Sequence, residues 1–321
     1  MTRRIILAIA LLAVAGASYQ FLGTRIDAQR SPEPGRLVDV GGHHLRINCS
    51  GHGSPTVILD SGLGDILVEW EAVQNQLSAF TRVCSYDRAG YGGSDPGPFP
   101  RTSWQVSGEL RILLQNAGEH PPFILVGHSF GGYNVRVFNG RYPDEVLGLV
   151  LVDATQEDQY ELLPDTWKQL SASQLQRWQS QAKWLPLQID LGIARLRYGK
   201  QLGKYGYLYL QSKYLKARAS ELQHIRVSAE QARSAGGIGN KPLTVLTGVQ
   251  LDTALKTALS AQDFLRFQQI WVGTLQARLA HLSTQGKQVT LSGAGHDIPA
   301  EQPRAVVDAV REIVAKTPQR L

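Results

Sequence analysis

A serine flanked by glycines has the setting of a catalytic nucleophile. Residues 127–131 read Gly-His-Ser-Phe-Gly, directly after the apolar run 122–126 and before a stretch with helical spacing at 133–141. A tight turn between a strand and a helix strains the backbone at Ser129, and the flanking glycines leave room for neighbouring strands. The N-terminus of the following helix would favour an oxyanion. We therefore predict that Ser129 is a nucleophile that attacks a carbonyl carbon.

A serine nucleophile needs a general base, and one histidine stands in a suitable context. His296 lies in Gly-Ala-Gly-His-Asp-Ile-Pro (293–299), after the apolar run 289–291 and before a C-terminal helix predicted at 303–316. None of the other histidines of the chain has this context. We expect His296 to take the Ser129 proton and return it to the leaving group. His128, beside the nucleophile, is expected to pack beneath it or to orient the loop.

An acid must hold the second nitrogen of the imidazole, and two aspartates could do so. Asp153 ends the apolar run 146–152, and Asp252 follows the run 243–247 at a spacing one residue longer than usual. Both keep the chain order nucleophile, acid, histidine. An aspartate at position 153 could also only cap the end of its strand. We favour Asp153, with Asp252 as the alternative.

Short apolar runs alternate with helical patterns on both sides of a helical segment. Strands are predicted at 56–59, 122–126, 146–152, 243–247 and 288–291, and helices at 68–80, 104–117 and 303–316. This alternation predicts an α/β fold with a mostly parallel central sheet and helices on both faces. Residues 154–240 show little strand character. The expected organisation is a core from 36–153 and 241–321, interrupted by a helical lid at 154–240.

These motifs resemble the α/β-hydrolase superfamily, specifically its bacterial secreted or membrane-anchored serine hydrolases. The resemblance covers residues 36–153 and 241–316. Leu-Asp-Ser-Gly-Leu-Gly at 59–64 stands where the superfamily places its oxyanion loop, with Ser-Gly in place of the usual His-Gly. Because backbone amides bind the oxyanion, the resemblance implies that the N–H groups of Leu63 and Phe130 form the oxyanion hole. A second loop, at 85–95, resembles the superfamily's Asp-x-x-Gly-x-Gly-x-Ser loop, and we expect its Asp87 and Arg88 to brace the site entrance.

The resemblance implies a serine hydrolase of the esterase or lipase type that cleaves carboxylic esters or similar acyl substrates through an acyl-enzyme. A cofactor-free haloperoxidase or a carbon–carbon bond hydrolase would keep the same three residues. A protein of another class, which only binds a ligand on a hydrolase fold, also remains open because function lies in the site and not in the fold.

Composition favours a globular enzyme over a nucleic-acid-binding protein. The chain has 321 residues and a net charge of +6. Residues 1–30 carry +3 and residues 154–240 carry +5, so the remainder is about −2. No nucleic-acid-binding motif accompanies this regional charge. A metal-binding His-Glu-x-x-His, a P-loop and a dinucleotide fingerprint are also missing from the sequence, so we expect no cofactor and no metal.

The N-terminus is predicted to direct the protein across a membrane. An apolar run at 5–17 follows Arg3 and Arg4, and Ala15-x-Ala17 resembles a signal cleavage site. We assign residues 1–23 to a signal peptide or a retained membrane anchor and 24–35 to a polar linker. Either interpretation places the enzyme outside the cytoplasm, in the periplasm, in the medium or on the membrane surface. The two cysteines, Cys49 and Cys84, are then free to form a disulfide, although two buried thiols would also fit.

Aromatic residues are frequent in the predicted lid. Most are expected to pack the lid against the core. Some are expected to line an acyl pocket for a lipid-like substrate or to contact lipid, with the basic residues of the lid meeting anionic head groups. They are Trp167, Trp178, Trp184, Tyr205, Tyr207, Tyr209 and Tyr214.

Overall fold

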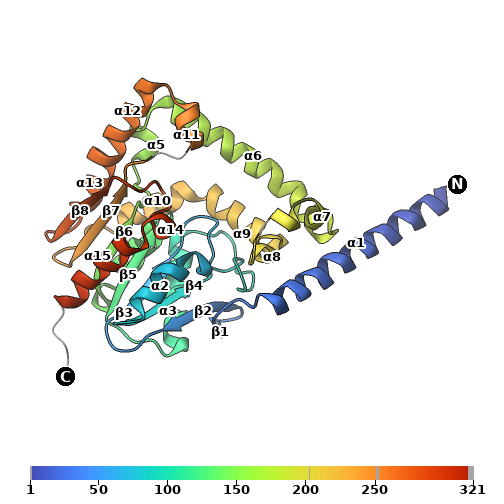
Figure 1. The fold of residues 1–321 in the computed structure, drawn as a ribbon, viewed down its shortest axis with the longest axis horizontal. Helices are drawn as coiled ribbons and strands as arrows, with labels where there is room; N and C mark the ends of the chain where they lie inside the picture. Colours follow the sequence, from blue (N-terminus) through green and yellow to red (C-terminus); the bar gives the residue numbers. More distant parts are fainter. Residues whose placement is uncertain (1, 202, 251–252, 317–321) are drawn as a thin grey trace.

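An eight-stranded sheet in the order β1-β2-β4-β3-β5-β6-β7-β8 forms the centre of the molecule (Figure 1). The computed structural model describes residues 2–201, 203–250 and 253–316. β1 and β2 pair antiparallel, as do β2 and β4, and every other neighbouring pair is parallel. The strands are β1 (Arg36–Asp39), β2 (His44–Ser50), β3 (Thr56–Asp60), β4 (Arg82–Tyr86), β5 (Phe123–His128), β6 (Val146–Val152), β7 (Leu243–Gly248) and β8 (Gly286–Leu291).

Helices follow most of the parallel strands. In the core they are η1 (Leu67–Trp70), α2 (Glu71–Leu77), α3 (Ser103–Ala117), α4 (Gly131–Arg141), η2 (Pro143–Glu145), α11 (Thr253–Ala258), α12 (Ala261–Ile270), η4 (Trp271–Gln276), α13 (Ala277–Ala280), α14 (Ile298–Glu301) and α15 (Pro303–Ala315). The segment between β6 and β7 forms α5 (Gln159–Leu162), α6 (Asp165–Asp190), α7 (Ile193–Tyr198), η3 (Gly199–Gln201), α8 (Gly206–Tyr209), α9 (Ser212–Gln223) and α10 (Ile225–Ser234). At the N-terminus, α1 (Thr2–Arg30) projects from the body of the molecule (Figure 1).

Both faces of the sheet are buried, as the alternation along β3 shows. Ile58 belongs to one apolar cluster, with residues of α3, α4 and α13, whereas Val57 and Leu59 belong to another, with residues of α2 and α15. Successive side chains of a strand point to opposite faces, so a strand that is buried on both sides is apolar throughout. The predicted fold class is therefore confirmed, including the helices on both faces.

Two predicted elements differ in extent from those observed. The helix predicted at 68–80 is a 3₁₀ turn followed by α2, which ends at Leu77 because Phe80 and Thr81 turn back onto the Leu77 carbonyl before β4. Helix α1 continues to Arg30, into the range predicted as a linker. Residues 24–30 contain no glycine or proline, and the helix stops shortly before Pro32, whose ring disfavours helical backbone in the preceding residue.

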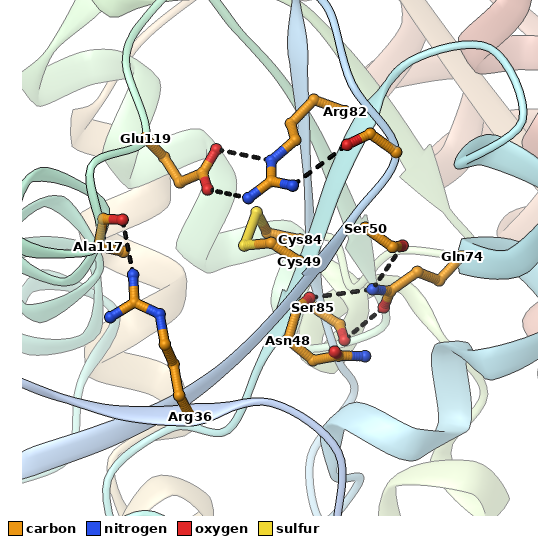
Figure 2. Close-up of a disulfide and its surroundings, with 11 residues drawn as sticks. Arg36, Asn48, Cys49, Ser50, Gln74, Arg82, Cys84, Ser85, Ala117 and Glu119 are labelled. Atoms are coloured by element: carbon orange, nitrogen blue, oxygen red, sulfur yellow. Dashed lines mark hydrogen bonds and ion pairs between the residues drawn. A yellow bond between two sulfur atoms is a disulfide. The ribbon is translucent and has the colours of Figure 1, made fainter.

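A disulfide joins the antiparallel edge of the sheet to its parallel part. Cys49 and Cys84 are directly opposite each other in the pairing of β2 with β4, and their sulfurs are bonded (Figure 2). Arg82 lies beside this bond and donates to both carboxylate oxygens of Glu119, at 3.2 and 2.6 Å. The expected disulfide is thus present, and it ties strands that are separated by 35 residues in sequence.

We expect the double substitution of Cys49 and Cys84 by serine to lower the free energy of unfolding by about 2–4 kcal/mol. The bond restricts the unfolded chain over the loop between β2 and β4. Urea unfolding of the full chain in detergent measures the change, with the disulfide-retaining Ser50→Ala variant as control. An unchanged unfolding midpoint would show that the bond contributes nothing to stability.

Candidate active site

The turn between β5 and α4 holds Ser129 in a left-handed backbone conformation, with φ of 51°. Its amide donates to the Val152 carbonyl at 3.1 Å, and its own carbonyl accepts from the amide and the hydroxyl of Thr155. A side chain at Gly131 would collide with the Asp60 carbonyl of β3. The surrounding strands therefore impose a conformation that a serine does not readily adopt alone.

Three side chains from the ends of three parallel strands form one hydrogen-bonded chain. Ser129 Oγ lies 3.0 Å from Nε2 of His296, and Nδ1 of His296 lies 2.7 Å from Oδ2 of Asp153. Ser129 follows β5, Asp153 follows β6 and His296 lies in the loop after β8. The carboxyl ends of parallel strands meet at one edge of a sheet, which is why residues so distant in sequence come together.

Asp153 is held by more than the histidine. Its Oδ1 accepts from the backbone N–H of Gly248 at 3.1 Å and from the indole Nε1–H of Trp271 at 3.0 Å. Asp153 also has a positive φ, of 40°. Trp271 opens a π-helical turn, a local irregularity that is frequent at functional sites. The sequence pattern gave no signal for Trp271, because its indole reaches Asp153 only through the packing of η4 against the sheet.

The alternative acid, Asp252, lies outside the described residues. The imidazole of His296 needs an acceptor at Nδ1, and Oδ2 of Asp153 supplies it. The other oxygen, Oδ1, accepts from two other donors. A carboxylate bonded to Nδ1 fixes the tautomer that leaves Nε2 free to accept the serine proton.

The imidazole of His296 faces the solvent on one side and the protein on the other, with 51% of its side-chain surface exposed. Desolvation by the surrounding protein lowers the pKa of His296, but the hydrogen bond and the charge of Asp153 outweigh it. The pKa of His296 is therefore raised above its ordinary value. A base with a raised pKa binds the proton of a serine more readily as that proton is released.

His128 connects the nucleophile turn to the histidine loop. Its Nε2 lies 2.9 Å from the backbone carbonyl of His296, so Nε2 carries the proton of this hydrogen bond. Its Nδ1 lies 3.7 Å from Asp65, and its ring is 5.0 Å from that of His296, centroid to centroid. His128 therefore orients the loop that carries His296, one of the two roles expected for it.

The loop after β3, residues 61–64, stands where the oxyanion loop is predicted, and we call it the oxyanion loop; it lies against Ser129. A methyl group at Gly62 would come within 3.4 Å of the Ser129 Cβ. Arg88 donates to the carbonyls of Ser61 and Gly62 at 2.7 and 2.8 Å. In a trans peptide the N–H points opposite to the carbonyl, so Arg88 fixes the direction of the Leu63 N–H. In the described residues neither Leu63 nor Phe130 donates its amide to a protein acceptor.

Arg88 also stands at the centre of a buried ion cluster. It pairs with Asp60 of β3 at 3.0 Å and with Glu221 of α9 at 2.8 Å, and Tyr86 and Tyr91 donate to these two acids. Burial raises the pKa of Asp60, although the charge of Arg88 opposes the shift. Asp87 instead accepts the amides of Leu67 and Gly93. The expectation that residues 87 and 88 brace the entrance thus agrees with these contacts, but the partner Glu221 could not be read from a motif.

A cleft of about 430 Å³ begins at the oxyanion loop and extends beneath the helices of residues 154–240. Its lining is mostly apolar and aromatic, with one guanidinium, that of Arg218, which stacks on the Trp178 ring at 3.7 Å. The lining residues are Leu63, Gly64, Asp65, Trp178, Leu185, Tyr198, Tyr209, Leu210, Tyr214, Leu215 and Arg218. Such a volume and lining suit a small organic ligand.

Among the described residues, one group of potential metal ligands is close enough to share an ion, and it lies away from this edge of the sheet. It consists of Cys49, Cys84 and Glu119. Both sulfurs are used in the disulfide, and both Glu119 oxygens accept from Arg82. The group is therefore better explained by structural bonds than by a metal.

Comparison with known proteins agrees with this architecture. A family model described as alpha/beta hydrolase fold matches residues 55–205. The chain has the α/β-hydrolase fold. An "AB hydrolase superfamily protein" from Gibberella zeae is 29% identical over 282 residues, which cover 81% of this chain and 86% of that protein. A thermophilic esterase from Thermogutta terrifontis superposes with a TM-score of 0.61 at 23% identity and covers 88% of this chain and 98% of its own.

The proteins that this chain resembles differ in length and description. A protein from Hormonema carpetanum named "Probable transporter efuK" is 35% identical over 136 residues, but these are 40% of this chain and 20% of that protein. The predicted resemblance is confirmed by the family model and by the Gibberella zeae relative, and the family model supports a hydrolase. The relatives include fungal and bacterial proteins, so a bacterial origin stays a prediction.

We expect Arg88→Met to lower the free energy of unfolding by about 3–5 kcal/mol, because it leaves Asp60 and Glu221 buried without their cation. Arg111→Met is the matched control. Arg111 pairs with Glu145 at the surface, where losing the pair costs at most about 1 kcal/mol. Urea unfolding of both variants measures the difference. Equal losses would show that the buried cluster is no more important to the fold than a surface pair.

Proposed function

We propose that this protein is a serine hydrolase that cleaves carboxylic esters or similar acyl compounds. The observation that carries the proposal is the continuous hydrogen-bonded chain from Ser129 Oγ through His296 to Asp153. The strained turn at Ser129, the oxyanion loop against its Cβ and the cleft that Leu63 and Gly64 of this loop line support it. A protein that only binds a ligand would need none of this alignment.

In the proposed reaction, Ser129 Oγ attacks the substrate carbonyl while Nε2 of His296 takes the hydroxyl proton. The negative charge that develops on the carbonyl oxygen is bound by the amides of Leu63 and Phe130, whose directions are set by Arg88 and by the start of α4. The intermediate collapses, and His296 protonates the departing alcohol. Water, activated by the same histidine, then releases the acid from Ser129.

In the proposed reaction the acid also has a role. Asp153 stabilises the imidazolium that forms when His296 accepts the proton, and it keeps Nδ1 protonated in the resting enzyme. The helices of residues 154–240 would act as the lid over the cleft, with the aromatic wall from Tyr198, Tyr209 and Tyr214 around the acyl group. In this proposal the predicted lid forms one wall of an acyl pocket.

We also propose that α1 is a retained anchor and that the catalytic domain lies outside the cytoplasm. By length and composition, α1 is the one helix in the described residues that could cross a membrane. Its C-terminal half is bonded to the enzyme, since Gln20 donates to the Leu210 carbonyl at 2.8 Å and Asp27 pairs with Arg195 at 2.6 Å. The disulfide is typical of an oxidising compartment.

A fluorophosphonate probe tests the nucleophile directly. We expect the folded wild-type chain to be labelled at Ser129 and the Ser129→Ala variant to be unlabelled and to lose about 10⁴-fold or more in kcat on 4-nitrophenyl esters. Mass spectrometry of the labelled peptide identifies the site, and Ser103→Ala, at a buried serine away from the cleft, is the control. Folded wild-type protein that takes up no label would refute the proposal.

The pH dependence tests the acid. His296 must be neutral to act as base, so its raised pKa places the acid limb of kcat/KM above the pH expected for an ordinary histidine. We expect Asp153→Asn to lower kcat by about 10⁴-fold and to move that limb to lower pH, because the carboxylate charge is gone. Asp252→Asn is expected to leave both unchanged. The opposite pattern would make Asp252 the acid.

A further inference from the structure

The helical segment between β6 and β7, which we call the insert, has a corner that lies beside the apolar part of α1. We define this α6–α7 corner as residues 184–198. A side chain at Gly16 would collide with the Leu191 carbonyl, and one at Gly192 would lie 3.2 Å from the Tyr19 ring. These contacts bring the backbone of the corner directly against α1, as Figure 1 shows for α7 and the middle of α1.

The position of this contact along α1 sets its depth. The apolar run at 5–17 reaches the length of a bilayer only when it is extended to Gly23, and residues 5–23 are about 28 Å long at ~1.5 Å per residue, close to the ~30 Å hydrocarbon core of a bilayer. Gly16 lies about 10 Å along the helix from Gly23, which ends this segment. If α1 spans a bilayer, the corner therefore lies about 10 Å below the boundary, the depth at which interfacial helices bury their apolar faces.

The surface of the corner has the composition that this depth requires. Ile189 is buried, but five other large apolar side chains of the corner are exposed in the protein alone: Trp184 (67%), Leu187 (53%), Ile193 (47%), Leu196 (74%) and Tyr198 (38%). Exposed apolar groups that gather beside an anchor, and not scattered singly, mark an interaction surface. Burying them in lipid would remove their contact with water.

Polar contacts between α1 and the insert lie on the side of Gly16 that faces the body of the enzyme. Arg195 donates to Gln20, Thr24 and Asp27 at 3.2, 3.2 and 2.6 Å. These polar side chains form hydrogen bonds with one another near the end of the apolar segment. Asp190, the acid of the corner, is bonded to Ser212 at 2.5 Å.

The sequence from the corner onward is basic, as expected of a segment at a membrane surface. Between residues 191 and 210 the sequence contains Arg195, Arg197, Lys200 and Lys204 and no aspartate or glutamate. Arg195 is paired with Asp27, whereas Arg197, Lys200 and Lys204 beside an inserted apolar face can attract anionic lipid head groups, by about 1 kcal/mol each near the surface. This charge favours a lipid bilayer over a second copy of the chain, whose own basic segment would be repelled.

We propose that the α6–α7 corner is a second bilayer-contacting surface, inserted beside the anchor in the outer leaflet. Leu185 of α6 and Tyr198 of α7 belong both to this corner and to the lining of the cleft. The cleft therefore opens at the membrane boundary. Resting on the proposed hydrolase function, this arrangement indicates that the substrate is an acyl ester resident in the membrane, taken up without passing through water.

Spin labelling of the full-length chain in phosphatidylcholine–phosphatidylglycerol vesicles tests the insertion. A nitroxide is attached at Leu196→Cys or, as the matched control, at Leu265→Cys, a leucine of α12 that is also exposed (59%, against 74% for Leu196). The two native cysteines are bonded to each other and do not react. We expect oxygen to relax the label at position 196 strongly and a water-soluble nickel complex to relax it weakly, with the reverse at position 265.

The other outcomes overturn the proposal in distinct ways. Strong relaxation by nickel at position 196 would place the corner in water. Weak relaxation by both reagents would place it against protein, such as a second copy of the chain. Membrane-like relaxation at both positions would show that lipid contact is not specific to the corner.

A kinetic comparison separates this proposal from the proposed function. We expect Leu196→Glu to reduce hydrolysis of a long-chain ester embedded in vesicles by about tenfold or more, because a charge resists insertion. Hydrolysis of water-soluble 4-nitrophenyl acetate should be unchanged, and Leu265→Glu should affect neither. Equal activity of Leu196→Glu and wild type on both esters would overturn uptake from the bilayer. Wild-type protein that hydrolyses neither ester would refute the hydrolase function, while the spin-label result still decides insertion.

Discussion

The buried guanidinium of Arg88 is the interaction on which the site depends. It bonds to two successive carbonyls of the oxyanion loop and to the carboxylates of Asp60 and Glu221, and all of these groups are shielded from water. Burial alone would lower the pKa of Arg88, but the two acids raise it, so the group stays charged. A fixed charge in a medium of low dielectric constant orients its partners strongly. The loop beside Ser129 is thereby rigid before any substrate arrives.

Preorganisation of this kind explains why the site stands at the end of the sheet. The strands β3, β5, β6 and β8 each deliver one part: the oxyanion loop, Ser129, Asp153 and His296. Hydrogen bonds between the parts, such as that from His128 to the His296 carbonyl, remove the freedom that short loops would keep. Donors that are already aligned need little reorganisation as charge develops, which is the main source of catalysis in such sites.

Sequence reasoning reached the parts of the structure that depend on local pattern. The alternation of apolar runs predicted the sheet, and the glycines around Ser129 predicted the turn, because both signals lie within a few residues of what they describe. The choice between Asp153 and Asp252 could not be made that way. The choice depends on the packing of β6 against β7, which determines the carboxylate that points toward His296. The indole of Trp271 and the carboxylate of Glu221 were missed for the same reason, since each reaches the site across more than a hundred residues of sequence.

The contacts of the insert divide it into a fixed part and a part that is free to adjust. Helices α9 and α10 are tied to the core by Glu221 and by the hydroxyls of Ser220 and Ser228, which accept the amides of Arg101 and Ser103. The other part, α6 and α7, contacts α1 and α9, and Trp167 of α6 packs against Phe267 of the core helix α12. A movement of the whole insert would break the Arg88–Glu221 pair. It would leave the charge of Arg88 buried without this partner, at a cost of several kcal/mol. Opening of the cleft would therefore have to come from α6 and α7, which pack on the core helix α12 through Trp167 and on the anchor helix through the α6–α7 corner.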